Sequence, residues 1–258
     1  MTDYSEIDQP LLLGYLFYPR QDFTPCPDGA FDLPIQVGQD VSIVCRFHGV
    51  RKDWPWILFF HGNGEVVGDY DDIALLYQKK GINLVVADYR GYGASTGNPT
   101  ISYLIQDAHS LLAAVKKELA RKGFRQDVWV MGRSLGNISA WELGSTHPDQ
   151  IKGLVIESGF ASVTRLIQLL RLPARAIALE PIEKERWTAI RKMALPVLII
   201  HGARDHLIPL EEAQDLWVNL PAGKKDLVII PRADHNNILQ VNSEFYLETI
   251  RKFITATQ

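Results

Sequence analysis

A Gly-x-Ser-x-Gly pentapeptide between an apolar run and a helical stretch is the feature that most constrains the fold of this chain. Residues 128–131 are bulky and apolar, and Gly132-Arg133-Ser134-Leu135-Gly136 follows at once. Residues 138–143 are typical of a helix. A serine at such a strand-to-helix turn has its hydroxyl raised above a sheet, and the glycines let strand and helix pass closely. The pattern predicts Ser134 as a nucleophile, with an incidental serine in a glycine-rich turn as the alternative.

Apolar runs alternate with helical patterns along most of the chain. Strands are expected at residues 12–18, 41–47, 56–61, 83–88, 128–131, 153–157, 196–201 and 226–230. Helices are expected at 70–79, after Thr100, after the pentapeptide, from about Glu211, and at the end of the chain, where Tyr246, Ile250 and Phe253 share one face. This alternation predicts an α/β fold with a doubly wound, mostly parallel sheet. We expect the first two strands to form an antiparallel edge, with residues 20–40 as a loop between them.

The segment 160–194 is longer than a simple crossover between two strands requires. It is rich in apolar residues and contains Arg165, Arg171 and Arg175. We expect a small helical cap here, within a single domain that spans residues 1–258, at the sheet edge where ligands bind in open α/β folds. An ordinary amphipathic helix pair is the alternative. The arginines suit a solvated helix face better than a site for a substrate carboxylate.

Charge and cysteine content exclude several classes of function. The 258 residues carry a formal net charge of -3, with a pI near 6.2, so there is no electrostatic basis for binding nucleic acid or an anionic membrane. Cys26 and Cys45 are too few for a disulfide framework, although one bridge stays open. The acidic start, residues 1–8, is not a secretory signal, and the apolar run 10–19 is too short to span a bilayer. We expect a cytoplasmic protein without an integral membrane segment, and the oligomeric state stays open.

An acid and a base follow two later strands, in the loops where each strand ends. Asp205 comes after the strand at 196–201, and His235 comes after the strand at 226–230. Loops that follow parallel strands open at the same edge of a sheet, so both side chains can converge on Ser134. The chain order Ser…Asp…His is the order of a nucleophile-elbow hydrolase. The sequence predicts a catalytic triad of Ser134, Asp205 and His235.

A triad of this kind also needs two N–H groups for the negative charge that develops on the substrate oxygen. The residue after the nucleophile, Leu135, supplies one at the start of a helix. A glycine-bordered loop after an earlier strand, His61-Gly62-Asn63-Gly64, is the source we expect for the second. The backbone N–H groups of Asn63 and Leu135 are therefore the predicted oxyanion hole.

Four motifs in this order resemble the α/β-hydrolase superfamily over nearly the whole chain. They are His61-Gly62-Asn63-Gly64-Glu65, Asp88-Tyr89-Arg90-Gly91-Tyr92-Gly93-Ala94-Ser95, the pentapeptide at 132–136, and the Asp205 and His235 loops. The second motif and the start Leu16-Phe17-Tyr18-Pro19-Arg20 are similar to a compact branch of esterases and depalmitoylating thioesterases. The resemblance implies hydrolysis of a small-molecule acyl ester or thioester, a short cap and no cofactor. We expect this protein to lack the N-terminal anchor and the cysteine cluster of some members of that branch. Asn137 stands where a small residue often follows the turn, which is expected to narrow the site.

Other functional classes have weaker support in the residues. Residues 62–68, with Asp88 after the next strand, imitate a dinucleotide fingerprint, so an NADP-binding oxidoreductase is one alternative. A hydrolase fold kept only as an interaction module is another, which the intact triad argues against. His201 and His206 fit no common zinc spacing, and we expect no metal. Glu157 and Asp234 are the alternative acids for the triad.

Overall fold

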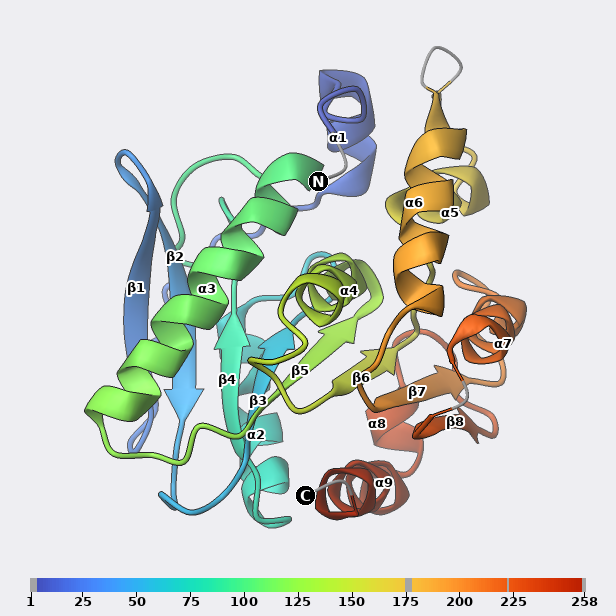
Figure 1. Cartoon of the computed structure of the whole chain (residues 1–258). Coiled ribbons are helices and arrows are strands. Elements are labelled where there is room, and N and C mark those ends of the chain that lie inside the picture. The colour runs from blue at the N-terminus through green and yellow to red at the C-terminus, as the bar shows by residue number, and fades with distance from the viewer. Residues whose placement is uncertain (1–3, 175–177, 222, 257–258) are drawn as a thin grey trace.

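The computed structural model describes residues 4–174, 178–221 and 223–256. Its described residues form one eight-stranded sheet in the order β1-β2-β4-β3-β5-β6-β7-β8 (Figure 1). The strands are β1 (Phe31–Gly38), β2 (Val41–His48), β3 (Trp56–Phe60), β4 (Asn83–Ala87), β5 (Val128–Arg133), β6 (Leu154–Glu157), β7 (Val197–Gly202) and β8 (Lys225–Ile230). From β4 to β8 every neighbouring pair is parallel, whereas β1–β2 and β2–β4 are antiparallel. The predicted α/β class and mostly parallel sheet are confirmed.

Helices cover both faces of the sheet. They are α1 (Pro10–Leu16), α2 (Asp71–Gln78), α3 (Ile101–Arg121), α4 (Asn137–Thr146), α5 (Val163–Leu169), α6 (Leu179–Arg191), α7 (Leu210–Asn219), α8 (Ile238–Val241) and α9 (Ser243–Thr255), with short 3-10 turns η1 (Val67–Tyr70) and η2 (Ser134–Gly136). Apolar residues of α3, α4, α6 and α7 belong to one buried cluster, and those of α2, α8 and α9 belong to the other. The sheet is therefore the middle layer of three (Figure 1).

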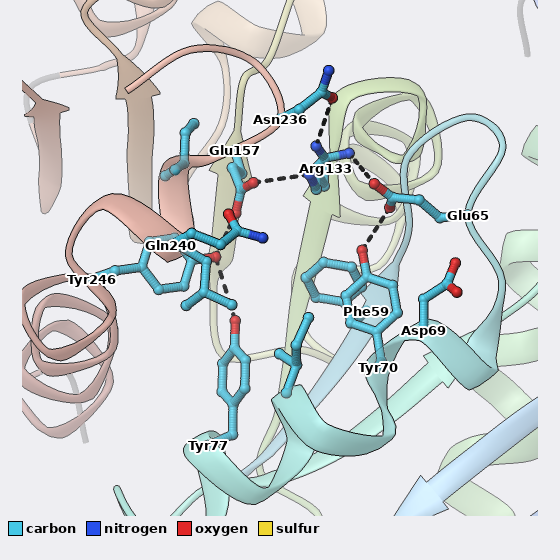
Figure 2. A pocket seen from close by; sticks show the side chains of 13 residues that line it. Phe59, Glu65, Asp69, Tyr70, Tyr77, Arg133, Glu157, Asn236, Gln240 and Tyr246 are labelled. Carbon is cyan, nitrogen blue, oxygen red and sulfur yellow. Dashed lines mark hydrogen bonds and ion pairs between the residues drawn. The ribbon is translucent and has the colours of Figure 1, made fainter. Parts of the chain in front are cut away.

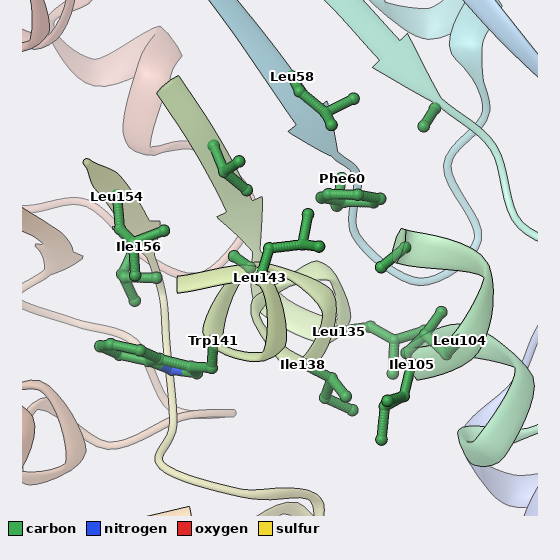
Figure 3. Packing of buried hydrophobic residues seen from close by; sticks show 14 of the residues in the cluster. Leu58, Phe60, Leu104, Ile105, Leu135, Ile138, Trp141, Leu143, Leu154 and Ile156 are labelled. Carbon is green, nitrogen blue, oxygen red and sulfur yellow. The ribbon is translucent and has the colours of Figure 1, made fainter. Parts of the chain in front are cut away.

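The continuous apolar run of β3 follows from its place in the middle of these layers. Trp56, Leu58 and Phe60 face the cluster under α4, and Ile57 and Phe59 face the opposite cluster. Successive side chains of a strand point to opposite faces, so a strand covered on both sides must be apolar at every position. Figure 3 shows Leu58 and Phe60 among the residues packed around α4.

The first forty residues differ from the prediction. The segment expected as a strand at 12–18 is the helix α1, and the segment expected as a loop at 20–40 contains β1. Pro10 is suited to the first turn of a helix, and Leu12 and Leu16, four residues apart, are the buried pair of α1. Strand β1 lies at the edge of the sheet, where a proline such as Pro34 is tolerated, and Ile35 is its buried residue. The predicted antiparallel edge exists, but β1 and β2 form it.

The long helix α3 begins where the sequence predicts. The hydroxyl of Thr100 accepts a hydrogen bond from the N–H of Tyr103 at 3.0 Å, which caps the helix. The carboxylate of Asp8 accepts a second bond, from the N–H of Ile101 at 2.8 Å. The N-terminal segment is thereby joined to a helix that lies far from it in the sequence.

Two helices, α5 and α6, leave the sheet between β6 and β7, within the segment predicted as a cap (Figure 1). We call residues 160–194 the cap. Arg165 of α5 pairs with Glu212 of α7, so this arginine braces the cap against the body. Arg171 lies after α5, whereas Arg175 lies outside the described residues. The single-domain boundary at 1–258 stays a prediction.

Candidate active site

Ser134 sits at the sharp turn between β5 and α4. Its φ of +49° is a left-handed conformation that a residue with a side chain rarely adopts, as expected for a serine at a nucleophile-elbow turn. The flanking glycines are required by close packing. A Cβ on Gly132 would lie 2.6 Å from the carbonyl oxygen of Gly136, and one on Gly136 would overlap the carbonyl of Phe60. The turn is tight because strand and helix meet with backbone against backbone.

The three residues predicted for the triad lie in one hydrogen-bonded line. His235 Nε2 is 2.9 Å from Ser134 Oγ, and His235 Nδ1 is 2.8 Å from Asp205 Oδ2. Asp205 comes from the loop after β7 and His235 from the loop after β8, so both follow parallel strands as expected. All three side chains are buried. A line of hydroxyl, imidazole and carboxylate at these distances can move a proton from the hydroxyl to the ring.

The surroundings of Asp205 favour its charged form. Burial acts to raise the pKa of this carboxyl, but the hydrogen bond and charge of His235, together with the N–H of Ile208, lower it below its usual value. Its Oδ1 accepts hydrogen bonds from the N–H groups of Leu207 at 3.0 Å and Ile208 at 2.8 Å. An ionised Asp205 accepts a hydrogen bond from the Nδ1–H of His235. This bond favours the tautomer in which Nε2 can accept the hydroxyl proton of Ser134.

The two predicted oxyanion donors come from different elements of the fold. Leu135 lies in η2 at the start of α4, where backbone N–H groups are free to meet an anion. Asn63 is held in its loop by its side chain: Nδ2 donates to the carbonyl of Leu16 at 2.9 Å, and Oδ1 accepts from the N–H of Tyr18 at 3.0 Å and from Tyr92 Oη at 2.6 Å. Within the described part of the chain, no hydrogen bond uses the backbone N–H of Asn63.

The alternative acids are engaged elsewhere. Asp234 accepts hydrogen bonds from the N–H of Asn236 and from Asn237 Nδ2, both at 2.8 Å, and so stabilises its own turn. Glu157 binds Arg133 and the hydroxyl of Tyr246. Asp205 is thus the carboxylate that the structure brings to His235.

Asn137 does not narrow the site as expected. Its Nδ2 donates to the carbonyls of Ser134 and Glu157, each at 2.9 Å, and the residue is fully buried. The side chain therefore points into the protein and ties the end of β5 to the end of β6. It is a brace for the nucleophile turn.

Asp88 and His201, two of the residues that suggested a cofactor or a metal, are also committed to the fold. Asp88, the ribose partner in a dinucleotide site, is fully buried and accepts the N–H of Val67 at 3.0 Å. His201 is buried and donates from Nε2 to the carbonyl of Ile208 at 2.9 Å. Over the described residues, no three His, Cys, Asp or Glu side chains are grouped as metal ligands would be.

Arg133 and Glu65 are contacts of this site that do not appear among the predicted site residues. Arg133 precedes Ser134, pairs with Glu65, and donates from Nη2 to the carbonyl of His235 at 2.9 Å. Together with Asn236 they line a cavity of about 220 Å³ (Figure 2). The sequence contains one signal that could have indicated Arg133: a charged residue stands between Gly132 and Ser134, at the end of an otherwise apolar strand.

The mostly parallel sheet and the sharp turn at Ser134 are the features of an α/β-hydrolase fold. Comparisons with known proteins agree. Residues 55–180 match a family model described as serine aminopeptidase, S33. The protein bem46 of Schizosaccharomyces pombe is 28% identical over 205 residues, which cover 78% of this chain and 67% of that protein.

Solved structures extend the likeness to the whole fold. The esterase Pf2001 of Pyrococcus furiosus has a TM-score of 0.71 at 18% identity, covering 94% of this chain and 98% of the esterase. Est1E of Butyrivibrio proteoclasticus, solved with ferulic acid, has a TM-score of 0.71 at 20% identity and covers 87% and 98%. The chain therefore has the α/β-hydrolase fold. None of the helices in the described ranges combines the length and the apolar character needed to cross a membrane.

Proposed function

We propose that this protein hydrolyses carboxylic esters or thioesters with Ser134, His235 and Asp205 as its catalytic triad. The observation that carries the proposal is the hydrogen-bonded line from Ser134 Oγ to His235 Nε2 at 2.9 Å and from His235 Nδ1 to Asp205 Oδ2 at 2.8 Å. This arrangement activates a serine because the imidazole removes the hydroxyl proton as the oxygen attacks. The mechanism requires no cofactor and no metal.

The proposed reaction has two halves. Ser134 Oγ attacks the substrate carbonyl, and its proton passes to His235 Nε2. The N–H groups of Asn63 and Leu135 bind the oxyanion of the tetrahedral intermediate. When this intermediate collapses, the alcohol or thiol leaves with the proton from His235, and the acyl group stays on Ser134. Water then attacks the acyl-enzyme, again giving its proton to His235, and the acid is released as Ser134 regains its hydroxyl proton.

Several similarities support the substrate class. The structural likeness includes proteins named as esterases, and the Asp88 motif together with the start at residues 16–20 resembles the compact esterase and thioesterase branch. The matched family description also names an aminopeptidase, which makes an aminoacyl amide the second candidate substrate. We propose a cytoplasmic location as well, because Cys26 and Cys45 are unpaired thiols, as is usual in a reducing compartment.

A substrate panel with an active-site probe tests this function. We expect the wild-type protein to hydrolyse p-nitrophenyl esters and an acyl thioester faster than an aminoacyl-p-nitroanilide. A fluorophosphonate should label Ser134 covalently. Ser134→Ala should abolish labelling and lower kcat by about 10⁴-fold or more.

Three results would contradict the proposal. Labelling that survives Ser134→Ala would mean that another residue is the nucleophile. A faster anilide reaction would favour the aminopeptidase candidate over the esterase. Stabilisation by NADP without hydrolysis would instead support the oxidoreductase alternative.

A further inference from the structure

The guanidinium of Arg133 contacts three parts of the candidate site: the loop after β3, the end of β6 and the loop after β8. Arg133 directly precedes the nucleophile and is mostly buried. Its Nη1 pairs with Glu65, and its Nε lies 3.1 Å from Glu157 Oε1 (Figure 2). Its Nη2 donates to the carbonyl of His235 at 2.9 Å. Arginine can serve three partners at once because its donors form a rigid, planar fork.

The contact with Glu65 reaches the oxyanion loop, which we define as residues 61–65. Glu65 Oε2 accepts the N–H of Gly62 and the hydroxyl of Tyr70, each at 2.6 Å. The bond to Gly62 holds the His61–Gly62 peptide, which is next to the peptide that carries the Asn63 N–H, a proposed oxyanion donor. A side chain at Gly62 would overlap the guanidinium of Arg133, so loop and arginine are in direct contact.

The contact with the base reaches the His235 loop, which we define as residues 231–237. Arg133 Nη2 binds the backbone carbonyl of His235 and also lies 3.3 Å from Asn236 Oδ1. Imidazole orientation depends on where this backbone is held, because Nε2 must stay within hydrogen-bond reach of Ser134.

Glu157 completes the cluster from the neighbouring strand. Arg133 and Glu157 are register partners at the ends of β5 and β6, and the hydroxyl of Tyr246 donates to the same carboxylate. Burial acts to lower the pKa of Arg133, but the charges of Glu65 and Glu157 outweigh it and raise that pKa above its usual value. The guanidinium therefore stays charged and paired inside the protein.

We infer that Arg133 is a positioning residue that holds the oxyanion loop and the His235 loop at their working distances from Ser134. It acts from the residue next to the nucleophile: through Glu65 it holds the N–H of Gly62, beside the peptide that carries the Asn63 donor, and through the His235 carbonyl it places the imidazole. The inference rests on the function proposed above.

Arg133→Lys is the primary test, since lysine keeps the charge and loses the fork. With a p-nitrophenyl ester we expect kcat to fall about 10- to 100-fold, with KM within threefold of wild type, because partial loss of one oxyanion donor and of base orientation acts on the transition state. Affinity for a trifluoromethyl ketone, which forms a tetrahedral adduct with the serine, should fall by a similar factor.

Arg46→Lys is the matched control. Arg46 is a buried arginine of β2 that forks onto Asp32 at 2.7 and 2.8 Å, away from the triad. Both variants should lose thermal stability, but Arg46→Lys should keep the wild-type kcat. If Arg133→Lys and Arg46→Lys both fold and have the same kcat, the inference is overturned.

A charge-matched variant covers the case in which Arg133→Lys fails to fold. Arg133→Gln combined with Glu157→Gln removes one charge of each sign and retains the bond from Glu65 to Gly62. If this variant folds, it should show the same fall in kcat at nearly unchanged KM. A folded variant with the kcat of wild type would refute the positioning role.

A measurement that does not depend on catalysis tests the positioning role of Arg133 separately from the proposed function. In NMR spectra, Arg133→Lys should shift the resonances of the His235 Nδ1–H and the Asn63 N–H, and Arg46→Lys should not. If wild type hydrolyses no substrate of the panel, the proposed function fails and these shifts still decide the positioning role. Unchanged resonances would overturn it.

Discussion

Gly136, in the turn after β5, lies directly against the backbone carbonyl of Phe60 at the end of β3. The oxyanion loop begins one residue after Phe60, and Ser134 lies two residues before Gly136. This one backbone contact therefore sets the separation between the nucleophile turn and the loop that carries Asn63. The contact requires that Gly136 has no side chain. Its backbone conformation does not require a glycine, because a φ of -61° is open to any residue.

Gly136→Ala is expected to inactivate and destabilise the protein. The added methyl group must displace backbone, since the atoms it meets belong to Phe60 and His61. Overpacking of this kind costs about 1–3 kcal/mol. Gly14→Ala is the control, because a Cβ there meets nothing within 4 Å and alanine favours the helix α1. Urea unfolding with kcat measurement checks both, and a fully active, stable Gly136→Ala would show that the contact is not limiting.

Asp205→Asn should leave the fold intact and remove most activity. An asparagine at this position favours the wrong imidazole tautomer, and the loss in kcat can reach about 10⁴-fold. Asp234→Asn and Glu157→Gln should cost far less, because neither side chain contacts His235 in the described structure. The measurement is kcat for the three variants, with circular dichroism to confirm folding. An Asp205→Asn enzyme within tenfold of wild type would assign the role to another acid.

Short to medium acyl chains should be the preferred substrates. The cap contributes two short helices, α5 and α6, which is too little structure for a large lipase-type lid. Each buried methylene should gain at most about 0.8 kcal/mol until the pocket ends. A series of p-nitrophenyl esters gives kcat/KM against chain length. A steady rise as far as palmitoyl esters, with activation at a lipid interface, would contradict this expectation.

Cys26 should resist alkylation in the folded protein. Burial, helped by the charge of Asp32, raises the pKa of its thiol from 9.0 to about 11. A raised pKa means less thiolate, so at pH 8 about one thiol in a thousand is reactive, against about one in ten at the unshifted value. Iodoacetamide labelling followed by peptide mass spectrometry checks this, with guanidinium-unfolded protein as the control. Equally fast labelling of both states would be inconsistent with the shift.

The parts of the fold predicted correctly are those in which the signal is local. The buried strands are continuous apolar runs, and strand ends place Ser134, Asp205 and His235 at one edge without any knowledge of contacts. The incorrect predictions concern segments whose structure depends on their surroundings in the fold. An edge strand such as β1, with alternating exposed residues and Pro34, carries little apolar signal, and the leucine-rich segment of α1 suits a strand or a helix equally well.

The role inferred for Arg133 was beyond the reach of sequence reasoning for a different reason. Its partners Glu65 and His235 are 68 and 102 residues away in the chain, and each is a common residue type in a loop. Only the fold makes them neighbours. A buried charge network is specified by three-dimensional proximity, and no periodicity of the sequence encodes it.

Strands β6 and β7 pair directly, from Leu154 opposite Val197 to Glu157 opposite Ile200, although the chain leaves the sheet between them to form the cap. Their register is held by backbone hydrogen bonds below the point where the cap departs. We therefore expect a change in cap length to leave the separation of Ser134 and Asp205 nearly unchanged. In descendants of such a chain, we expect the cap to vary more readily than the strands that carry the candidate triad.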